Sequence, residues 1–206
     1  MAGESAFLGF VRVIAAGDVN LAEQLLAATP SLARAHLDVG ASRKGSTDYY
    51  LSDIEHYVYA GDTALHVAAA GYQLDLATSL VAAGAAVSAK NRRGAQPLHY
   101  AAEGHPGVAA VWNPDAQAAT IAYLISAGAD PNATDKSGVA PLHRAVRTRS
   151  AAAVRALIDG GADPLRPNRN GSTPMSLATQ NTGRGGTGAP ESKAQQREIV
   201  LLLEAY

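Results

Sequence analysis

One short segment recurs four times along the chain and constrains its fold more than any other feature. The copies begin at Gly61 (GDTALHVAAAG), Gly94 (GAQPLHYAAEG), Gly138 (GVAPLHRAVRT) and Gly171 (GSTPMSLATQN). Successive first glycines are separated by 33, 44 and 33 residues. A period of this length is typical of repeat proteins, in which each copy is a small unit that buries its apolar face against its neighbours.

Each position of the segment has a physical role at the start of a helix. The first glycine suits a tight turn with a positive φ angle, and the proline three residues later in three copies suits the first helical turn. Thr63 and Thr173 are expected to cap the helix that follows them. The predicted core positions are Leu65, Leu98, Leu142 and Met175, and the positions of close helix approach are Ala68, Ala101, Ala145 and Ala178.

Three of the copies are followed by a second helical pattern and a loop, namely SLVAAGAAVSAKNRR, YLISAGADPNATDKS and ALIDGGADPLRPNRN. Gly84, Gly128 and Gly161 suit left-handed caps at the ends of these second helices. The 33-residue period, the T-P-L-H-x-A start and the G-A-D loop together resemble the ankyrin-repeat family. The resemblance implies an all-α ankyrin-repeat solenoid of helix-turn-helix units with β-turn or hairpin loops.

We expect one ankyrin-repeat domain over residues 1–206, with units at about 5–37, 38–90, 91–135, 136–168 and 169–206. The N-terminal unit is degenerate, with helices predicted over Phe7–Ala16 and Leu21–Ala28. The last helix is predicted over Glu191–Ala205, with apolar residues on one side and charges on the other, as the end of a solenoid requires.

Three insertions interrupt the period, at residues 38–57, 104–115 and 181–190. The first contains Tyr49, Tyr50 and Tyr57, and Tyr59 follows directly, so that half of the eight tyrosines fall within eleven residues. Two interpretations stay open: a long loop that packs its own aromatics, or a flap over the concave face. In the second insertion Trp112, the only Trp, is either an anchor into the neighbouring unit or an exposed hot spot.

The third insertion, NTGRGGTGAP, contains a formal G-x-G-x-x-G pattern. A dinucleotide site is disfavoured because this pattern follows a helix rather than a strand. A backbone nest for one phosphate or carboxylate beside Arg184 and a flexible connector are the two remaining interpretations.

In the ankyrin family the turn tips and first helices line the concave face, which is the usual binding surface. Projecting that rule onto this chain predicts a basic face, and arginines on it suit bidentate contact with carboxylate or phosphate. A solvated charged face is the alternative. The predicted partner-binding residues are Tyr49, Tyr50, Tyr57, Tyr59, Asp62, Arg92, Arg93, Tyr100, Glu103, Trp112, Lys136, Arg144, Arg147, Arg149, Arg169, Gln180 and Arg184.

The histidines divide into repeated and irregular positions. His66, His99 and His143 recur at one repeat position, which in the ankyrin family is structural and bonds the turn of the neighbouring unit. A metal or proton-transfer site at Glu103, His105 and Asp115 lacks any further support, so neither a metal site nor a cofactor is predicted.

The favoured function is that of a binding module for a partner protein. The basic face predicts that this partner is acidic. The chain has no cysteine and no recognised catalytic motif. The competing hypothesis is a small-molecule enzyme or receptor for an acidic ligand, with a pocket formed by the tyrosine-rich insertion over Tyr100, Glu103, Arg144 and Arg147. Its catalytic candidates are Glu103, Tyr59, His56 and Arg147. A purely structural or inhibitory protein is a third hypothesis.

The charge balance and the N-terminus exclude other classes of partner. With 17 Lys and Arg against 18 Asp and Glu, the chain has a formal charge of −1, so nucleic-acid binding is not expected. Neither a signal peptide nor an apolar run of transmembrane length is expected, which predicts a cytoplasmic protein that does not bind membranes. The excess of Arg over Lys and the abundance of Ala are typical of bacteria with GC-rich genomes.

Overall fold

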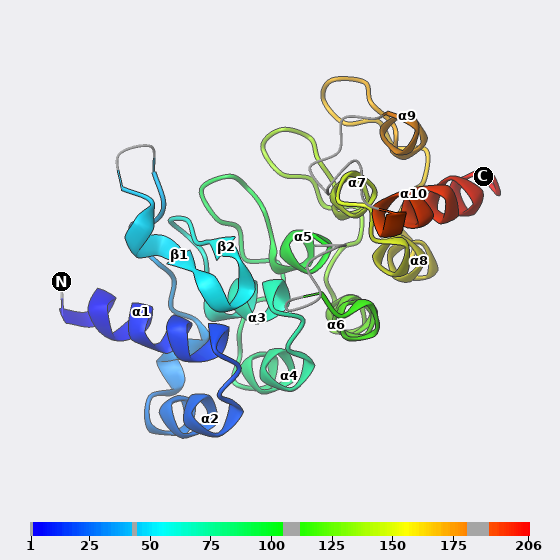
Figure 1. Cartoon of the computed structure of the whole chain (residues 1–206). Helices are drawn as coiled ribbons and strands as arrows, with labels where there is room; N and C mark the ends of the chain where they lie inside the picture. The colour runs from blue at the N-terminus through cyan, green and yellow to red at the C-terminus, as the bar shows by residue number, and fades with distance from the viewer. Residues whose placement is uncertain (1, 43–44, 105–111, 181–189) are drawn as a thin grey trace.

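The computed structural model describes residues 2–42, 45–104, 112–180 and 190–206 and confirms the predicted all-α solenoid. The α-helices are α1 (Ala2–Ala15), α2 (Val19–Ala28), α3 (Ala64–Ala70), α4 (Leu74–Ala82), α5 (Pro97–Ala101), α6 (Pro114–Ser126), α7 (Pro141–Arg147), α8 (Ala151–Asp159), α9 (Pro174–Thr179) and α10 (Pro190–Leu203). Figure 1 shows the odd-numbered helices beside the projecting turns and the even-numbered helices in an outer row.

The turns and helix starts follow the predicted local chemistry. Gly61, Gly94, Gly138 and Gly171 have φ angles of 85°, 78°, 71° and 78°. Gly138 leaves no room for a side chain, because a Cβ atom there would lie 2.8 Å from the backbone nitrogen of Arg169. Thr173 caps α9 as predicted by accepting the N–H of Ser176 at 3.2 Å.

The core runs through all the helix pairs as one continuous cluster, from Phe7 in α1 to Leu203 in α10. The predicted first-helix leucines are fully buried, and the alanines three residues after them are buried as well. Met175 differs from the prediction, since it is only partly buried and packs against the edge of the core. The repeated small residues therefore allow the close helix packing that the repeat pattern indicates.

The first insertion forms a small hairpin rather than an irregular loop. It contains the 3-10 turns η2 (Thr47–Tyr49) and η3 (Ser52–Ile54) and the strands β1 (Tyr50–Leu51) and β2 (His56–Tyr57). The strands are antiparallel, with Tyr50 opposite Tyr57. Buried Leu51, Ile54 and Val58 anchor the hairpin, whereas Tyr50 and Tyr57 are each 41% exposed. Aliphatic side chains thus hold the insertion, and two of its tyrosines remain available to solvent.

The terminal helices exist where predicted but with shifted boundaries. α1 begins five residues before the predicted Phe7 start, and α10 ends at Leu203 rather than at Ala205. α2 begins at Val19 because Asp18 caps it, accepting the N–H of Leu21 at 3.0 Å. A search of the described residues for a helix of the length and apolarity needed to cross a bilayer found none.

Candidate functional site

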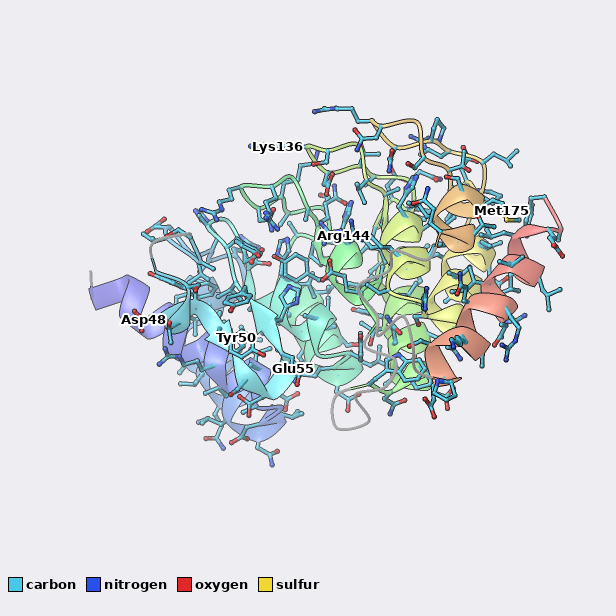
Figure 2. The ribbon with its side chains drawn as sticks, turned by 45° about the horizontal axis from the view of Figure 1, so that its top comes forward. Asp48, Tyr50, Glu55, Lys136, Arg144 and Met175 are labelled. Atoms are coloured by element: carbon cyan, nitrogen blue, oxygen red, sulfur yellow. The ribbon has the colours of Figure 1, made fainter. Side chains whose placement is uncertain are left out.

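The turns between units are joined to one another through main-chain hydrogen bonds. The N–H of Arg92 donates to the carbonyl oxygen of Ala60 at 2.8 Å, and the N–H of Lys136 donates to that of Arg93 at 2.9 Å. Figure 2 shows Lys136 at the end of a projecting turn, away from the helices. The side chains of Arg92, Arg93, Lys136 and Arg169 are exposed on these turns. The fold therefore presents cations on successive turns whose spacing is fixed by the backbone.

Tyr59 stands at the first of these turns and contacts two of the arginines. The Cζ atoms of Arg92 and Arg93 lie 5.2 Å and 4.5 Å from the centroid of the Tyr59 ring. At such distances the ring face attracts a guanidinium group. The Arg92 guanidinium also donates to the carbonyl oxygen of Ala41, so its position is held by the insertion. Both arginines are exposed.

Asp62 is not a surface contact, although the repeat pattern places it on the concave face. Its side chain is fully buried and accepts from Tyr100 Oη at 2.8 Å and from Asn91 Nδ2 at 2.9 Å. The N–H of Tyr59 donates to the same carboxylate at 2.6 Å. Burial, followed by the charge and hydrogen bond of Asp62, raises the pKa of Tyr100 well above its usual value. Asp62 and Tyr100 therefore form an internal polar network.

Arg144 is likewise internal, because it is only 8% exposed and pairs with two carboxylates. Its guanidinium nitrogens lie 2.8 Å from Glu103 Oε1 and 3.2 Å from Asp135 Oδ2. Figure 2 shows Arg144 over the middle of the array. Burial raises the pKa of Asp135, but backbone N–H groups and Arg144 outweigh burial and bring that pKa below its usual range. Arg144 therefore bridges two acids and offsets one of their two negative charges.

His56 of the insertion contacts α5, the first helix of the third unit. Its ring lies 4.5 Å from the Tyr100 ring, centroid to centroid, and its Nδ1 is 3.8 Å from Glu103 Oε2. The hairpin thus reaches over Tyr100 and Glu103, as one of the two interpretations of the insertion predicts. Four of the residues predicted to line a pocket or binding face, namely His56, Tyr100, Glu103 and Arg144, are brought together.

Two of the three repeated histidines, His66 and His99, bond the turn of the next unit, as the family resemblance implies. Nδ1 of His66 accepts the N–H of Thr63 at 3.1 Å, and Nε2 lies 3.1 Å from the carbonyl oxygen of Ala95 in the next turn. His99 repeats this arrangement with Gln96 and Val139. Since Nδ1 accepts, Nε2 carries the proton and the ring is neutral. Burial is the main cause of the lowered pKa of His66 and of His99, which falls to about 4.

The other predicted site residues are more scattered. Arg147 is exposed at the end of α7 and Gln180 directly after α9, whereas Arg149 is 3% exposed with a φ angle of 60°. Tyr49 is half-buried. Trp112 Nε1 donates to Oε1 of the buried Gln117 at 3.3 Å, a contact within its own unit. Arg184 and His105 lie outside the described residues.

The polar residues that sequence reasoning missed are Asn91, Asp135 and Asn168, each three residues before a turn glycine. The side-chain oxygen of Asn91 accepts the N–H groups of Arg93 and Ala95, and Asp135 and Asn168 do the same one and two units later. An Asp or Asn at this spacing is the signature of an Asx turn and was visible in the sequence. These side chains hold the turns that carry the exposed cations.

Comparison with known families identifies the architecture. A family model of three successive ankyrin repeats matches residues 108–203, and a model of the single ankyrin repeat matches residues 60–92. No curated protein matches the chain. Together the two models cover more than half of the sequence, and the first of them includes Asp135 and Arg144. The repeat period, the stacked helix pairs and these matches lead to one conclusion: the chain belongs to the ankyrin-repeat family.

Proposed function

We propose that the chain is a protein-binding module that holds an acidic segment of its partner along a basic row formed by Arg93, Lys136 and Arg169. Ankyrin repeats generally mediate interactions between proteins. The charges of the row support the more specific part of the proposal, namely that the bound segment is acidic. Within the described residues, no carboxylate lies within 4.0 Å of the charged groups of this row.

The turns favour binding because they are fixed before the partner arrives. The bond between Lys136 N–H and the Arg93 carbonyl ties two members of the row directly. The Asx turns at Asp135 and Asn168 hold the backbone beside Lys136 and Arg169. A row with fixed spacing loses little conformational freedom on binding, which is the usual advantage of a preorganised surface.

Arg144 supports the basic row without contacting the partner. Its single positive charge offsets part of the negative charge of Glu103 and Asp135, the two acids that would otherwise oppose an acidic segment more strongly on this side. Rim charges of opposite sign raise the rate of association more than the final affinity. We therefore expect the partner to contact Arg93, Lys136 and Arg169. Arg144 and Asp62 support these residues from inside the fold.

The competing small-molecule pocket has less support in the observed contacts. The hydroxyl of Tyr100 is bonded to Asp62, and the carboxylate of Glu103 is bonded to Arg144. A ligand or a catalytic role for Glu103 and Tyr100 would have to replace these bonds, and each bond lost in a buried site is costly. Binding on the open turns requires no such exchange.

The test is titration of the whole chain with a fluorescent oligoglutamate peptide. Arg93→Glu and Lys136→Glu should each weaken binding at least about tenfold, and binding should weaken as salt rises. Arg197→Glu is the matched control, because it makes the same charge change at an exposed position on α10. Equal weakening by Arg197→Glu, or no saturable binding to the unaltered chain, would contradict the proposal.

A further inference from the structure

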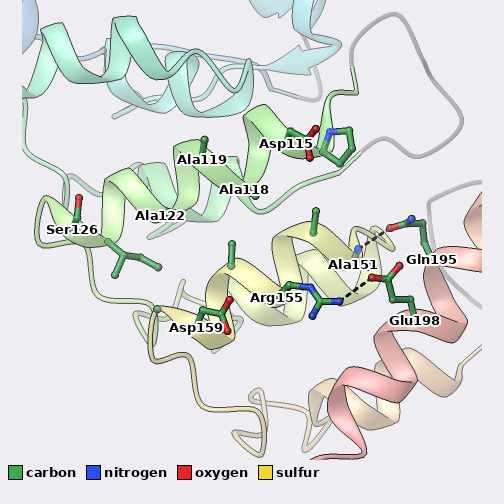
Figure 3. Close-up of a pocket in the computed structure, with 15 residues that line it drawn as sticks. Asp115, Ala118, Ala119, Ala122, Ser126, Ala151, Arg155, Asp159, Gln195 and Glu198 are labelled. Atoms are coloured by element: carbon green, nitrogen blue, oxygen red, sulfur yellow. Dashed lines mark hydrogen bonds and ion pairs between the residues drawn. The ribbon is translucent and has the colours of Figure 1, made fainter.

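A second surface lies on the opposite side of the molecule, between the outer helices. A groove of about 740 Å³ runs between α6 and α8 and reaches α10 at one end. Figure 3 shows Ala118, Ala119 and Ala122 along one side, with Arg155 and Glu198 on the other. We call this hollow the outer groove. The basic row stands on the turns and contributes no residue to it.

The outer groove exists because α6 carries alanine where α4 carries larger side chains. Ala118, Ala119 and Ala122 occupy the repeat positions that Leu74, Asp75 and Thr78 occupy 44 residues earlier. Ala119 and Ala122 are exposed, and Ile125 is partly buried beneath the end of the groove. The small side chains therefore leave a hollow with mainly apolar walls between α6 and α8.

The charges around the outer groove are predominantly acidic. Asp115 lies on α6 at one end, and Asp159 lies on α8 at the opposite end, which Ser126 of α6 also lines (Figure 3). Among the described residues, neither carboxylate has a cation within 4.0 Å. Arg155 pairs with Glu198 at 3.2 Å and is therefore already neutralised. An occupant of the groove thus meets apolar surface in the middle and a carboxylate at each end.

The geometry points to one kind of occupant: we propose that the outer groove binds an amphipathic helix of a second partner protein, with a basic residue at each end of its apolar face. From Asp115 to Ser126 the groove follows α6 for about 16 Å at the usual helical rise. A bound helix would span that length with about eleven residues, and residues eleven apart lie on the same helical face. Two basic residues at this spacing can therefore meet Asp115 and Asp159 while the apolar residues between them fill the groove.

The test uses the full chain and an end-capped helical peptide with two lysines at that spacing and leucines between them on the same face. The peptide should bind saturably and perturb the amide NMR signals of α6 and α8. Ala122→Trp, which fills the groove, should weaken binding at least about tenfold. Thr78→Trp is the matched control at the same repeat position of α4 and should bind as the unaltered chain does.

A charge variant keeps the test informative if Ala122→Trp does not fold. The double change Asp115→Lys and Asp159→Lys should abolish binding of the lysine peptide and strengthen that of a peptide with glutamates instead. Arg93→Glu should leave lysine-peptide binding unchanged, which separates this site from the basic row. Failure of the lysine peptide to bind, or equal binding of the glutamate peptide, would overturn the proposal. Self-association of the chain that Ala122→Trp removes would also overturn it, because a second copy would then be the occupant.

Discussion

Nε2 of His99 lies 3.1 Å from the carbonyl oxygen of Val139, which belongs to the turn of the following unit. The opposite ring nitrogen accepts the N–H of Gln96 at 3.2 Å, so a second proton on the ring would face a donor. The bond from Gln96 at the start of α5 therefore requires the neutral histidine, whereas the bond to Val139 could also be made by the protonated ring. Stability should depend on pH for this reason.

The free energy of unfolding should fall as the pH drops from about 6.5 to about 4. Burial lowers the pKa of His99 from 6.5 to about 4, so the unfolded chain takes up the proton first as the pH falls. The stabilisation is complete above pH 6.5 and is lost progressively towards pH 4. The contribution of His99 is about 3 kcal/mol. Urea unfolding across this range should show it, with a shallower slope for His99→Gln and an unchanged slope for His36→Gln, whose side chain is exposed.

Arg144→Met should destabilise the fold by about 3 to 5 kcal/mol, because it leaves Glu103 and Asp135 without their cation. Arg155→Met is the matched control, since it breaks the ion pair with Glu198, in which both side chains are about half exposed. An exposed pair of this kind contributes less than about 1 kcal/mol. Equal losses for the two variants in urea unfolding would show that Arg144 is not held as described.

Gly138→Ala should destabilise more than Gly171→Ala, although both glycines hold the same position in their turns. Each has a positive φ angle, so each substitution costs about 1 kcal/mol in backbone strain. Only at Gly138 does the added Cβ meet backbone, 2.8 Å from the nitrogen of Arg169, whereas at Gly171 it meets nothing within 4 Å. The overlap should add at least about 1 kcal/mol. Thermal unfolding of the two variants measures the difference, and equal melting temperatures would contradict the observed packing of the turns.

His56→Ala should release the hairpin without unfolding the array. The His56 ring contacts Tyr100 and lies beside Glu103, and both contacts leave with the side chain. Hydrogen exchange of the Val58 amide, which donates to the Tyr49 carbonyl, should become about ten times faster. The amide of Ala102 at the end of α5 should exchange as before. Unchanged exchange at Val58 would mean that Leu51 and Ile54 hold the hairpin alone.

The sequence allows prediction of the local features that repeat and gives less information on long-range pairing. The turn glycines, the prolines and the buried leucines could be placed because each acts within a few residues of its own position. Arg144 and Lys136 are both basic residues in the same unit, yet one is buried and one exposed. The difference comes from Glu103, which lies 41 residues before Arg144 in the chain. Within the insertion, Tyr50 and Tyr57 pack on each other with ring centroids 4.8 Å apart, as one interpretation expects, but the buried anchors are the less conspicuous Leu51 and Ile54.

The bonds between turns also determine how the array can deform. The buried directional bonds described between units, such as His66 to Ala95 and His99 to Val139, lie on the turn side. On the outer side, exposed bonds such as those between Ser79 and Glu23 or Arg155 and Glu198 accompany a buried bond from Ser150 Oγ to Oε1 of Gln117. Stretching the turn side would break several buried bonds together, whereas spreading the outer helices elsewhere breaks exposed bonds. The easiest deformation of the array is therefore a change of curvature, in which the outer helices move apart or together while the turns keep their spacing.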